Sequence, residues 1–225
     1  MAEIIPIAYI KTDFKEKFGI PRQSGMVNSL AKIVFEKEFR NPEALRGIEE
    51  FSHLWIIFDF SFNHSEKWSA TVRPPRLGGN KRKGVFASRS PFRPNSLGLS
   101  CVKLEKLEKN KTFGTYLVVS GADCLDNTPI FDIKPYIPYC DCKNNAEGSY
   151  AEENKNYKLE VIFNNNLLNI IPKNKQQVII DCLAQDPRPS YHDDDKKIYY
   201  FKFDIFEISF VVKKQKLTVL DVKEK

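Results

Sequence analysis

The chain has 225 residues, enough for one large domain or for one domain with a smaller one attached. Hydrophobic residues make up 42% of it and charged residues 28%, with a net charge of +6, which is typical of ordinary globular proteins. No apolar run approaches the roughly 18 residues of a membrane span, and the first residues lack the basic-then-apolar order of a signal peptide. We therefore expect a cytoplasmic protein with no membrane partner.

The cysteines and histidines favour neither a disulfide framework nor a metal centre. Five cysteines are an odd number, and Cys140 and Cys142 are separated by one residue rather than the two of a typical zinc or redox pair. The three histidines are scattered along the chain. We expect reduced structural thiols and no bound metal.

The first part of the chain consists of short strand patterns separated by turns. Strands are predicted at 3–10, 29–39, 52–62, 84–88, 97–108, 112–122 and 129–137, with 52–62 as a continuous apolar run at the centre of a sheet. Asn41 and Pro42 predict the start of a short helix over 42–51. Because no strand leads promptly into a Gly-rich turn and a long helix, a doubly wound nucleotide-binding sheet is not indicated. Residues 1–142 instead favour an antiparallel or mixed β-barrel with few helices.

The second part begins after a polar stretch, 142–156, that is typical of a linker. The chain resumes with YKLEVIF, residues 157–163, and two or three strands are predicted from Lys197 onward. Apolar residues at 178, 179, 182 and 183 have helical spacing. We expect a mainly β protein with a barrel domain over 1–142 and a small α+β domain over 157–225.

One long stretch carries charge of a single sign. From Lys67 to Leu104 there is no Asp or Glu, although the stretch contains nine basic residues. Such a run is typical of a phosphate-binding surface, with a solvated basic face as the alternative. Within it, Arg73 and Arg76 are three residues apart in TVRPPRLGGN, where they either clamp phosphates or pair with structural carboxylates.

The stretch GVFASRSPFRPNSLGLS, residues 84–100, places two arginines in a loop stiffened by prolines. A rigid backbone lowers the cost of holding two guanidinium groups in place. We expect Arg89 and Arg93 to face an anionic partner. We expect Phe92 to pack in the core rather than to stack on a base.

Other turns present polar groups. PRQSG, residues 21–25, is a shaped turn that displays Arg22 and Gln23. DNTP, residues 126–129, is a strong turn former that either only reverses the chain or presents backbone groups to the polar edge of an adenine. Asp132 and Lys134 share one face of a strand, where an internal ion pair is the simplest interpretation.

The segment DPRP, 186–189, follows the predicted C-terminal helix. Pro187 ends the helix, and the rigid segment either serves only for that or carries Asp186 and Arg188 to a site built elsewhere. The residues alone therefore indicate a β-rich protein prepared for an anionic partner. They contain neither a nucleophile–base pair nor a metal cluster, so they do not reveal a reaction.

In their order along the chain, these motifs resemble those of the TrmO (YaeB-type) family of tRNA methyltransferases. The matching pieces are KEKFGIPRQSG, FSHLWIIF, TVRPPRLGGN, GVFASRSPFRPNSLGLS, DNTPIFDIKPYIPY and LAQDPRPSY. The resemblance implies an S-adenosylmethionine-dependent enzyme that methylates N6 of N6-threonylcarbamoyladenosine at position 37 of threonine tRNAs. It also implies a β-barrel cofactor domain and a homodimer.

The resemblance carries over a set of cofactor-binding residues. They are Pro21, Arg22, Gln23, Ser61, Phe62, Arg89, Leu99, Asp126, Asn127, Thr128 and Pro129. The family commonly has glycine at the position of Asn127, but asparagine tolerates a positive φ better than most residues, so the turn is expected to survive. The region 61–69 matches the family poorly.

Methyl transfer from a sulfonium mainly requires alignment of donor and acceptor, which explains the lack of a conspicuous catalytic pair. Asp186 is our candidate acceptor for the N–H of the carbamoylated nitrogen, and Arg188 is our candidate cation for the threonyl carboxylate. The tRNA-binding candidates are Arg73, Arg76, Lys81, Arg82, Lys83 and Arg93. A non-catalytic tRNA- or cofactor-binding protein, or a methyltransferase for another small acceptor, remains the alternative.

Overall fold

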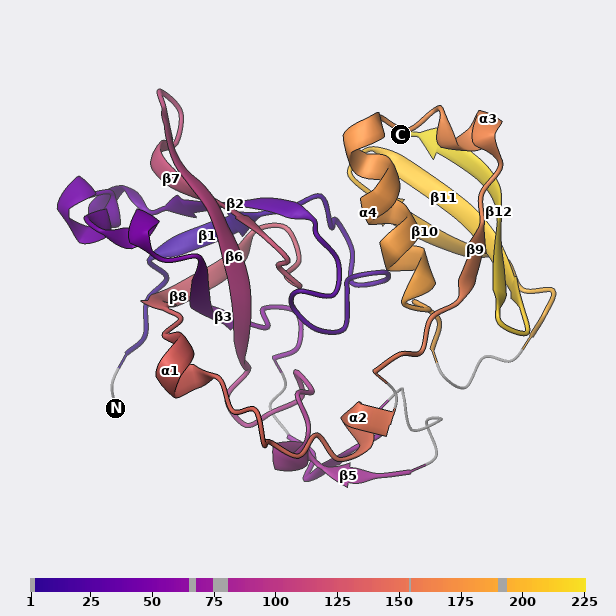
Figure 1. The fold of residues 1–225 in the computed structure, drawn as a ribbon, viewed down its shortest axis with the longest axis horizontal. Coiled ribbons are helices and arrows are strands. Elements are labelled where there is room, and N and C mark those ends of the chain that lie inside the picture. The colour runs from indigo at the N-terminus through magenta and orange to yellow at the C-terminus, as the bar shows by residue number, and fades with distance from the viewer. Residues whose placement is uncertain (1–2, 65–67, 75–80, 154, 190–193) are drawn as a thin grey trace.

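The computed structural model describes residues 3–64, 68–74, 81–153, 155–189 and 194–225. Six strands pair in the order β1-β2-β7-β6-β3-β8, and the sheet closes on itself as a barrel in which every neighbouring pair is antiparallel (Figure 1). The strands are β1 (Ala8–Lys11), β2 (Leu30–Phe35), β3 (His53–Asp59), β6 (Leu97–Asn110), β7 (Gly114–Ser120) and β8 (Thr128–Pro135). The prediction of a mainly β protein is confirmed.

The barrel interior follows from the alternation of side chains along its strands. In β3, the side chains of Leu54, Ile56 and Phe58 are buried, whereas the residues between them are only partly covered. The continuous apolar run therefore has one fully buried face rather than two. Asp132 and Lys134 form the expected ion pair on β8, with 2.7 Å between Oδ2 and Nζ.

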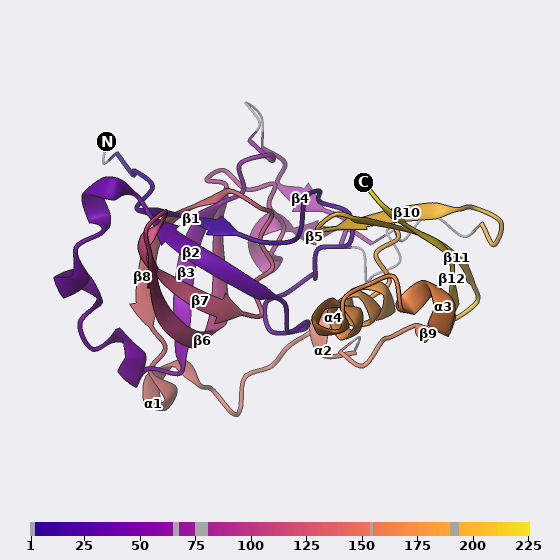
Figure 2. The ribbon, with the colours of Figure 1, turned by 90° about the horizontal axis from the view of Figure 1, so that it is seen from above.

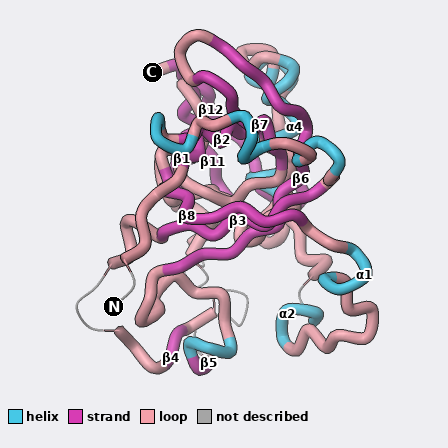
Figure 3. The backbone as a smooth tube through the Cα atoms, turned by 90° about the vertical axis from the view of Figure 1, so that its left-hand side faces the viewer, coloured by secondary structure: helices cyan, strands magenta, loops and turns pink. Residues whose placement is uncertain are grey.

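Several predicted elements differ from the structure: β1 begins only at Ala8, and the predicted strand 29–39 ends at Phe35. Residues 42–51 form two short 3-10 helices, Pro42–Leu45 and Ile48–Glu50, because Gly47 between them adopts a left-handed φ of 81°. Asn41 caps the first through its side chain, as expected. The predicted strand 84–88 is mostly a 3-10 helix, Val85–Ala87. The strand pairing there is limited to a two-residue hairpin of β4 (Thr71–Val72) and β5 (Lys83–Gly84), which Figure 3 shows below β3 and β8.

A second sheet forms the C-terminal part, to the right in Figure 1. Its strands are β9 (Glu160–Ile162), β10 (Tyr199–Phe203), β11 (Phe206–Lys213) and β12 (Lys216–Glu224), in the order β10-β11-β12-β9. The helix α4 (Lys173–Ala184) covers this sheet, and its buried residues Ile179, Cys182 and Leu183 have the predicted helical spacing (Figure 2). Other short helices in the described part of the chain are Lys37–Phe39 after β2, α1 (Pro138–Asp141) and α3 (Asn165–Leu168). Another, α2 (Tyr150–Glu153), lies in the predicted linker.

The N-terminal segment 13–27 joins the core of the C-terminal part. The ring of Phe14 is fully buried, and its centre lies 5.3 Å from that of Phe203 on β10. Val27 belongs to the same apolar cluster, and Phe18 packs against it. Lys175 on α4 forms an ion pair with Asp13 at 2.8 Å. This N-terminal segment therefore belongs to the apolar core of the C-terminal part, which the polar linker gave no reason to expect, while the barrel encloses a separate apolar core.

Within the described residues, no helix is both long and apolar enough to cross a membrane. All five cysteines lie in the described part of the chain and are free of disulfide bonds.

Candidate functional site

The turn at residues 21–23 is fixed against the C-terminal part of the chain. Arg22 donates from Nη2 to the backbone carbonyl oxygens of Asp186 and Arg188, at 3.0 and 3.3 Å. Pro21 is buried beside it. Two motifs that are more than 160 residues apart in sequence, PRQSG and DPRP, are therefore in direct contact.

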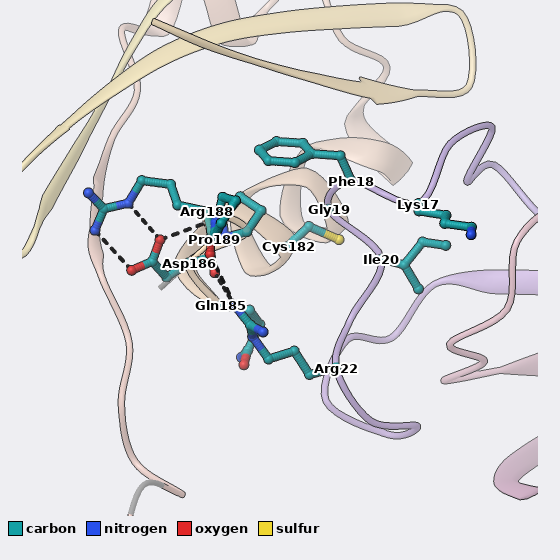
Figure 4. A pocket seen from close by; sticks show the side chains of 11 residues that line it. Lys17, Phe18, Gly19, Ile20, Arg22, Cys182, Gln185, Asp186, Arg188 and Pro189 are labelled. Atoms are coloured by element: carbon teal, nitrogen blue, oxygen red, sulfur yellow. Dashed lines mark hydrogen bonds and ion pairs between the residues drawn. The ribbon is translucent and has the colours of Figure 1, made fainter. Parts of the chain in front are cut away.

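A cavity of about 370 Å³ lies between these two motifs. One wall consists of Lys17 to Ile20 together with Arg22, and the other of Cys182 and Gln185 to Pro189 (Figure 4). Lys17 extends from this wall to the barrel, where its Nζ donates to the carbonyl oxygen of Phe62 at 2.7 Å. The cavity thus lies next to the loop that follows β3.

Asp186 and Arg188 are bound to each other. Arg188 donates from Nε and Nη2 to the two carboxylate oxygens of Asp186, at 2.8 and 3.0 Å, and the hydroxyl of Tyr157 donates to Oδ2 at 2.9 Å (Figure 4 shows the Asp186–Arg188 pair). Burial acts to raise the pKa of Asp186, but the hydrogen bonds and charge of Arg188 outweigh it and hold this pKa below its ordinary value. Both oxygens of the Asp186 carboxylate therefore accept hydrogen bonds already, and the carboxylate is a weak base.

Gln23 connects the same turn to the loop at 84–100. Arg89 donates from Nη1 to Oε1 of Gln23 at 2.5 Å, and Arg89 is an exposed residue. The structure thus brings together two of the motifs singled out in the sequence and leaves the guanidinium open to a further anion.

Asp123, just beyond β7, belongs to this group and was missed by the sequence reasoning. Its Oδ1 accepts a hydrogen bond from the Ser100 hydroxyl at 2.5 Å. Burial raises the pKa of Asp123, and the positive charge of Arg89 partly opposes this shift. The only signal in the sequence was an acidic residue between a strand and the DNTP turn, which is too common to identify a site.

Arg93 has a different position from Arg89. Its Nη1 donates to the carbonyl oxygens of Val85 and Ser88, at 3.1 and 2.8 Å, so the guanidinium closes the loop from within. Phe92 is 55% exposed, so the expectation that it packs in the core is wrong. The prolines on either side of it hold the residue at the tip of the loop, away from the barrel interior.

The turn 126–129 has the conformation expected for a position that usually holds glycine. Asn127 has a φ of +62°, which asparagine tolerates through its short polar side chain. Asp126 holds the turn, because its Oδ1 accepts from the Thr12 amide at 3.0 Å and its Oδ2 from Lys15 at 2.9 Å. Thr128 and Pro129 begin β8 and pair with β1.

The remaining cofactor candidates surround the loop after β3. Ser61 and Phe62 form an exposed turn there, and Phe62 is 68% exposed. Leu99 on β6 is paired with Ile57 on β3 and is 57% exposed. An apolar side chain that remains open beside polar groups is typical of a ligand-binding surface.

The basic candidates lie on the β4–β5 hairpin. Arg73 and Lys81 are exposed, and Arg82 donates from Nε to the Thr71 hydroxyl at 2.7 Å. The Nζ of Lys83 lies 5.7 Å from the ring centre of Tyr150. Arg76 lies outside the described residues. The hairpin therefore gathers three adjacent cations at one place on the surface.

Comparison with known proteins agrees with this arrangement. Residues 9–142 match the model of the tRNA-methyltransferase O N-terminal domain, and residues 156–225 match that of the TrmO C-terminal domain. The chain belongs to the TrmO family. Residues of the TrmO resemblance therefore lie in both matched parts, and the PRQSG and DPRP contact joins one part to the other.

Several TrmO relatives are similar over most of their length. A tRNA (adenine(37)-N6)-methyltransferase of Escherichia coli K12 is 40% identical over 84% of this chain and 83% of its own. A putative S-adenosylmethionine-dependent methyltransferase of Pseudomonas aeruginosa, RcsF, is also 40% identical, over 84% of this chain and 82% of its own. A crystal structure of TrmO from P. aeruginosa superimposes with a TM-score of 0.80 at 32% identity, covering 100% of this chain and 98% of that one.

Proposed function

We propose that this protein is an S-adenosylmethionine-dependent tRNA methyltransferase. It transfers a methyl group to N6 of N6-threonylcarbamoyladenosine at position 37 of threonine tRNAs. The product is the N6-methylated nucleoside. The observation that carries the proposal is the meeting of three family motifs, in which Gln23 contacts Arg89 and Arg22 contacts the DPRP segment. The names of the TrmO relatives support the same activity.

The side chains present are suited to S-adenosylmethionine. Arg89 offers an exposed guanidinium for a carboxylate, and the exposed side chains of Phe62 and Leu99 offer apolar surface for an adenosyl group. The turn at 126–129, with a left-handed Asn127, offers backbone groups to the edge of an adenine. Pro21 to Gln23, Ser61 and Thr128 to Pro129 complete the set that we propose for the cofactor.

S-Adenosylmethionine, when bound, supplies an already activated methyl group, so the protein has mainly to hold and align the reactants. The rigid contacts of Arg22 and Gln23 serve this purpose, because they fix the turn that bears both residues. Arg89 supplies a positive charge there, which acts on the buried carboxyl group of Asp123.

The contacts of Asp186 favour a positioning role over the acceptor role that the sequence suggested. Arg188 neutralises the Asp186 carboxylate, and the backbone carbonyl oxygens of both residues accept from Arg22. Through Arg22, the Asp186–Arg188 pair supports the turn 21–23. Lys17, Arg22 and Arg188 all line the cavity, but Arg188 is already paired with a carboxylate and is then less suited to the threonyl carboxylate.

Further parts of the proposal concern the whole protein. The basic residues of the hairpin hold tRNA phosphates, since cations that neutralise phosphates provide much of the affinity for nucleic acids. Residues 1–142 form the methyltransferase domain and 157–225 an accessory domain, and the protein works as a homodimer in the cytoplasm. These statements rest on the family resemblance.

The test is methyl transfer from labelled S-adenosylmethionine to threonine tRNA with and without the threonylcarbamoyl group. We expect transfer only to the tRNA that carries the group, and a large loss of cofactor affinity in Arg89→Ala. Cofactor binding without transfer to either tRNA would instead support a non-catalytic binding protein. Transfer to a small acceptor but to neither tRNA would support the other alternative.

A further inference from the structure

Two aromatic residues lie open on the surface beside the basic hairpin. Trp68 is 51% exposed and Phe86 is 72% exposed, although large apolar side chains are normally covered. Their ring centres are 6.0 Å apart and the rings are inclined by 30°, so they form a pair rather than two isolated side chains. We refer to Trp68 and Phe86 as the aromatic pair.

The backbone holds the aromatic pair in place from both sides. Trp68 comes just before β4, and Phe86 lies in the 3-10 helix that follows β5. The amide of Val85 donates to the carbonyl oxygen of Ala70 at 2.9 Å, and the Val85 side chain is buried beneath the loop. The two exposed rings are therefore carried by anchored backbone, which reduces the conformational entropy that a ligand would have to remove.

A fixed cation lies against the aromatic pair, and further basic residues belong to the neighbouring hairpin. The guanidinium carbon of Arg93 lies 5.8 Å from the ring centre of Phe86, and its Nη1 is fixed by two backbone carbonyls. Arg82 and Lys81 lie nearby on the arm that leads to β5. The sequence from Lys67 to Leu104, which carries the pair, contains no acidic residue.

The combination of open rings and fixed cations suits unpaired nucleotides. Proteins that bind single-stranded RNA stack bases on aromatic rings and attract the backbone with Lys and Arg. Aromatic residues and Arg are also enriched at protein–protein interfaces, but Lys is depleted there, and two surfaces of the same positive charge repel each other. Charge complementarity therefore favours RNA over a second copy of this chain.

The position of the pair relates it to the candidate site. Phe86 is three residues from Arg89, so their Cα atoms are at most about 11 Å apart. We propose that Trp68 and Phe86 form a stacking surface for unpaired bases beside the target adenosine in the anticodon loop. This inference rests on the proposed function and adds to it the residues that recognise an unpaired loop.

The test compares two RNA probes that carry the same number of phosphates, an anticodon stem-loop and a fully paired duplex. Binding is measured by fluorescence anisotropy for the wild type, the double variant Trp68→Ala/Phe86→Ala, and Phe86→Tyr, which keeps a ring. Phe51→Ala, at an exposed aromatic residue outside the hairpin, is the matched control. Because the substituted side chains are exposed, the thermal unfolding midpoint should stay within a few degrees in all of them.

We expect the double variant to bind the stem-loop about 5- to 150-fold more weakly, the range that corresponds to removing the stacking on one base. Its affinity for the duplex and its salt dependence should be unchanged, and Phe86→Tyr and Phe51→Ala should resemble the wild type. Unchanged affinity for the stem-loop, or an equal loss for both probes, would overturn the inference. A change in the oligomeric state of the double variant would also overturn it, in favour of a contact between copies.

The methyl-transfer assay separates this inference from the proposed function. If the wild type methylates tRNA but the double variant binds the stem-loop normally, only the inference fails. If the wild type methylates no tRNA yet needs the aromatic pair to bind the stem-loop, only the proposed function fails.

Discussion

Gly19 shows how one residue connects the candidate site to the fold. Its φ is +89°, and a Cβ atom added there would lie 2.2 Å from the ring of Phe201, which is fully buried. The close approach brings the segment 17–22, one wall of the cavity, against the C-terminal sheet. Only glycine allows both the left-handed φ and the close approach to the Phe201 ring without strain.

We predict that Gly19→Ala lowers the free energy of unfolding by about 1–3 kcal/mol for overpacking, in addition to the cost of the left-handed backbone. Gly25→Ala is the matched control, since Gly25 also has a positive φ of 75° but has open space around it. Urea unfolding of both variants measures the difference. Equal decreases would mean that packing against Phe201 contributes nothing.

The Asp186–Arg188 pair predicts a dependence of stability on pH. The folded-state pKa of Asp186 is lowered, so its carboxylate contributes stability that is present above the unfolded pKa and is lost as the pH falls through the folded pKa. We expect Asp186→Asn to be less stable than the wild type by about 1–3 kcal/mol above about pH 5. The difference should shrink below the ordinary carboxyl value of 3.8. A difference that is constant down to acid pH would contradict this account.

At the scale of elements, the alternation of apolar residues predicted the longer strands and the helix α4, because their buried faces have a clear period. This pattern failed for 84–88, where five residues are too few to separate a strand from a 3-10 helix.

The motifs of the candidate site were recognised in the sequence from their unusual turns and charges. Asp123 was missed because its role depends on Ser100 and Arg89, which only the fold brings near.

The β4–β5 hairpin is the element that we expect to hold tRNA phosphates. Replacing Lys81, Arg82 and Lys83 by glutamine should weaken tRNA binding and flatten its salt dependence, by a slope of about 0.7–0.9 for each phosphate that the protein no longer neutralises. The matched control replaces three exposed lysines of the C-terminal sheet, Lys213, Lys214 and Lys216. Titrations at several salt concentrations measure both. Identical slopes in the two triple variants would contradict the assignment.

At the scale of the whole molecule, the N-terminal segment makes the C-terminal core depend on residues of the other matched part. Phe14, Phe18 and Val27 leave the barrel and pack with the C-terminal sheet and α4. The C-terminal part therefore cannot keep its buried surface without this segment, whereas the barrel has a core of its own. The same packing holds PRQSG beside DPRP. The candidate site therefore forms only when both parts of the chain are folded.

We predict that the protein unfolds in a single cooperative transition despite its two sheets. Phe14→Ala should lower the free energy of unfolding by about 3–5 kcal/mol and still give one transition, because the void that it leaves lies where the N-terminal segment joins the C-terminal core. Scanning calorimetry with van't Hoff analysis measures this. Two resolved transitions in the wild type would show that the sheets unfold independently.

The measurement that tests the central claim most directly is mass spectrometry of nucleosides from threonine tRNA after incubation with the protein and S-adenosylmethionine. We predict that N6-threonylcarbamoyladenosine gains one methyl group at position 37, and that tRNA lacking the threonylcarbamoyl group gains none. A methyl group on any other nucleoside, or on unmodified adenosine 37, would contradict the account.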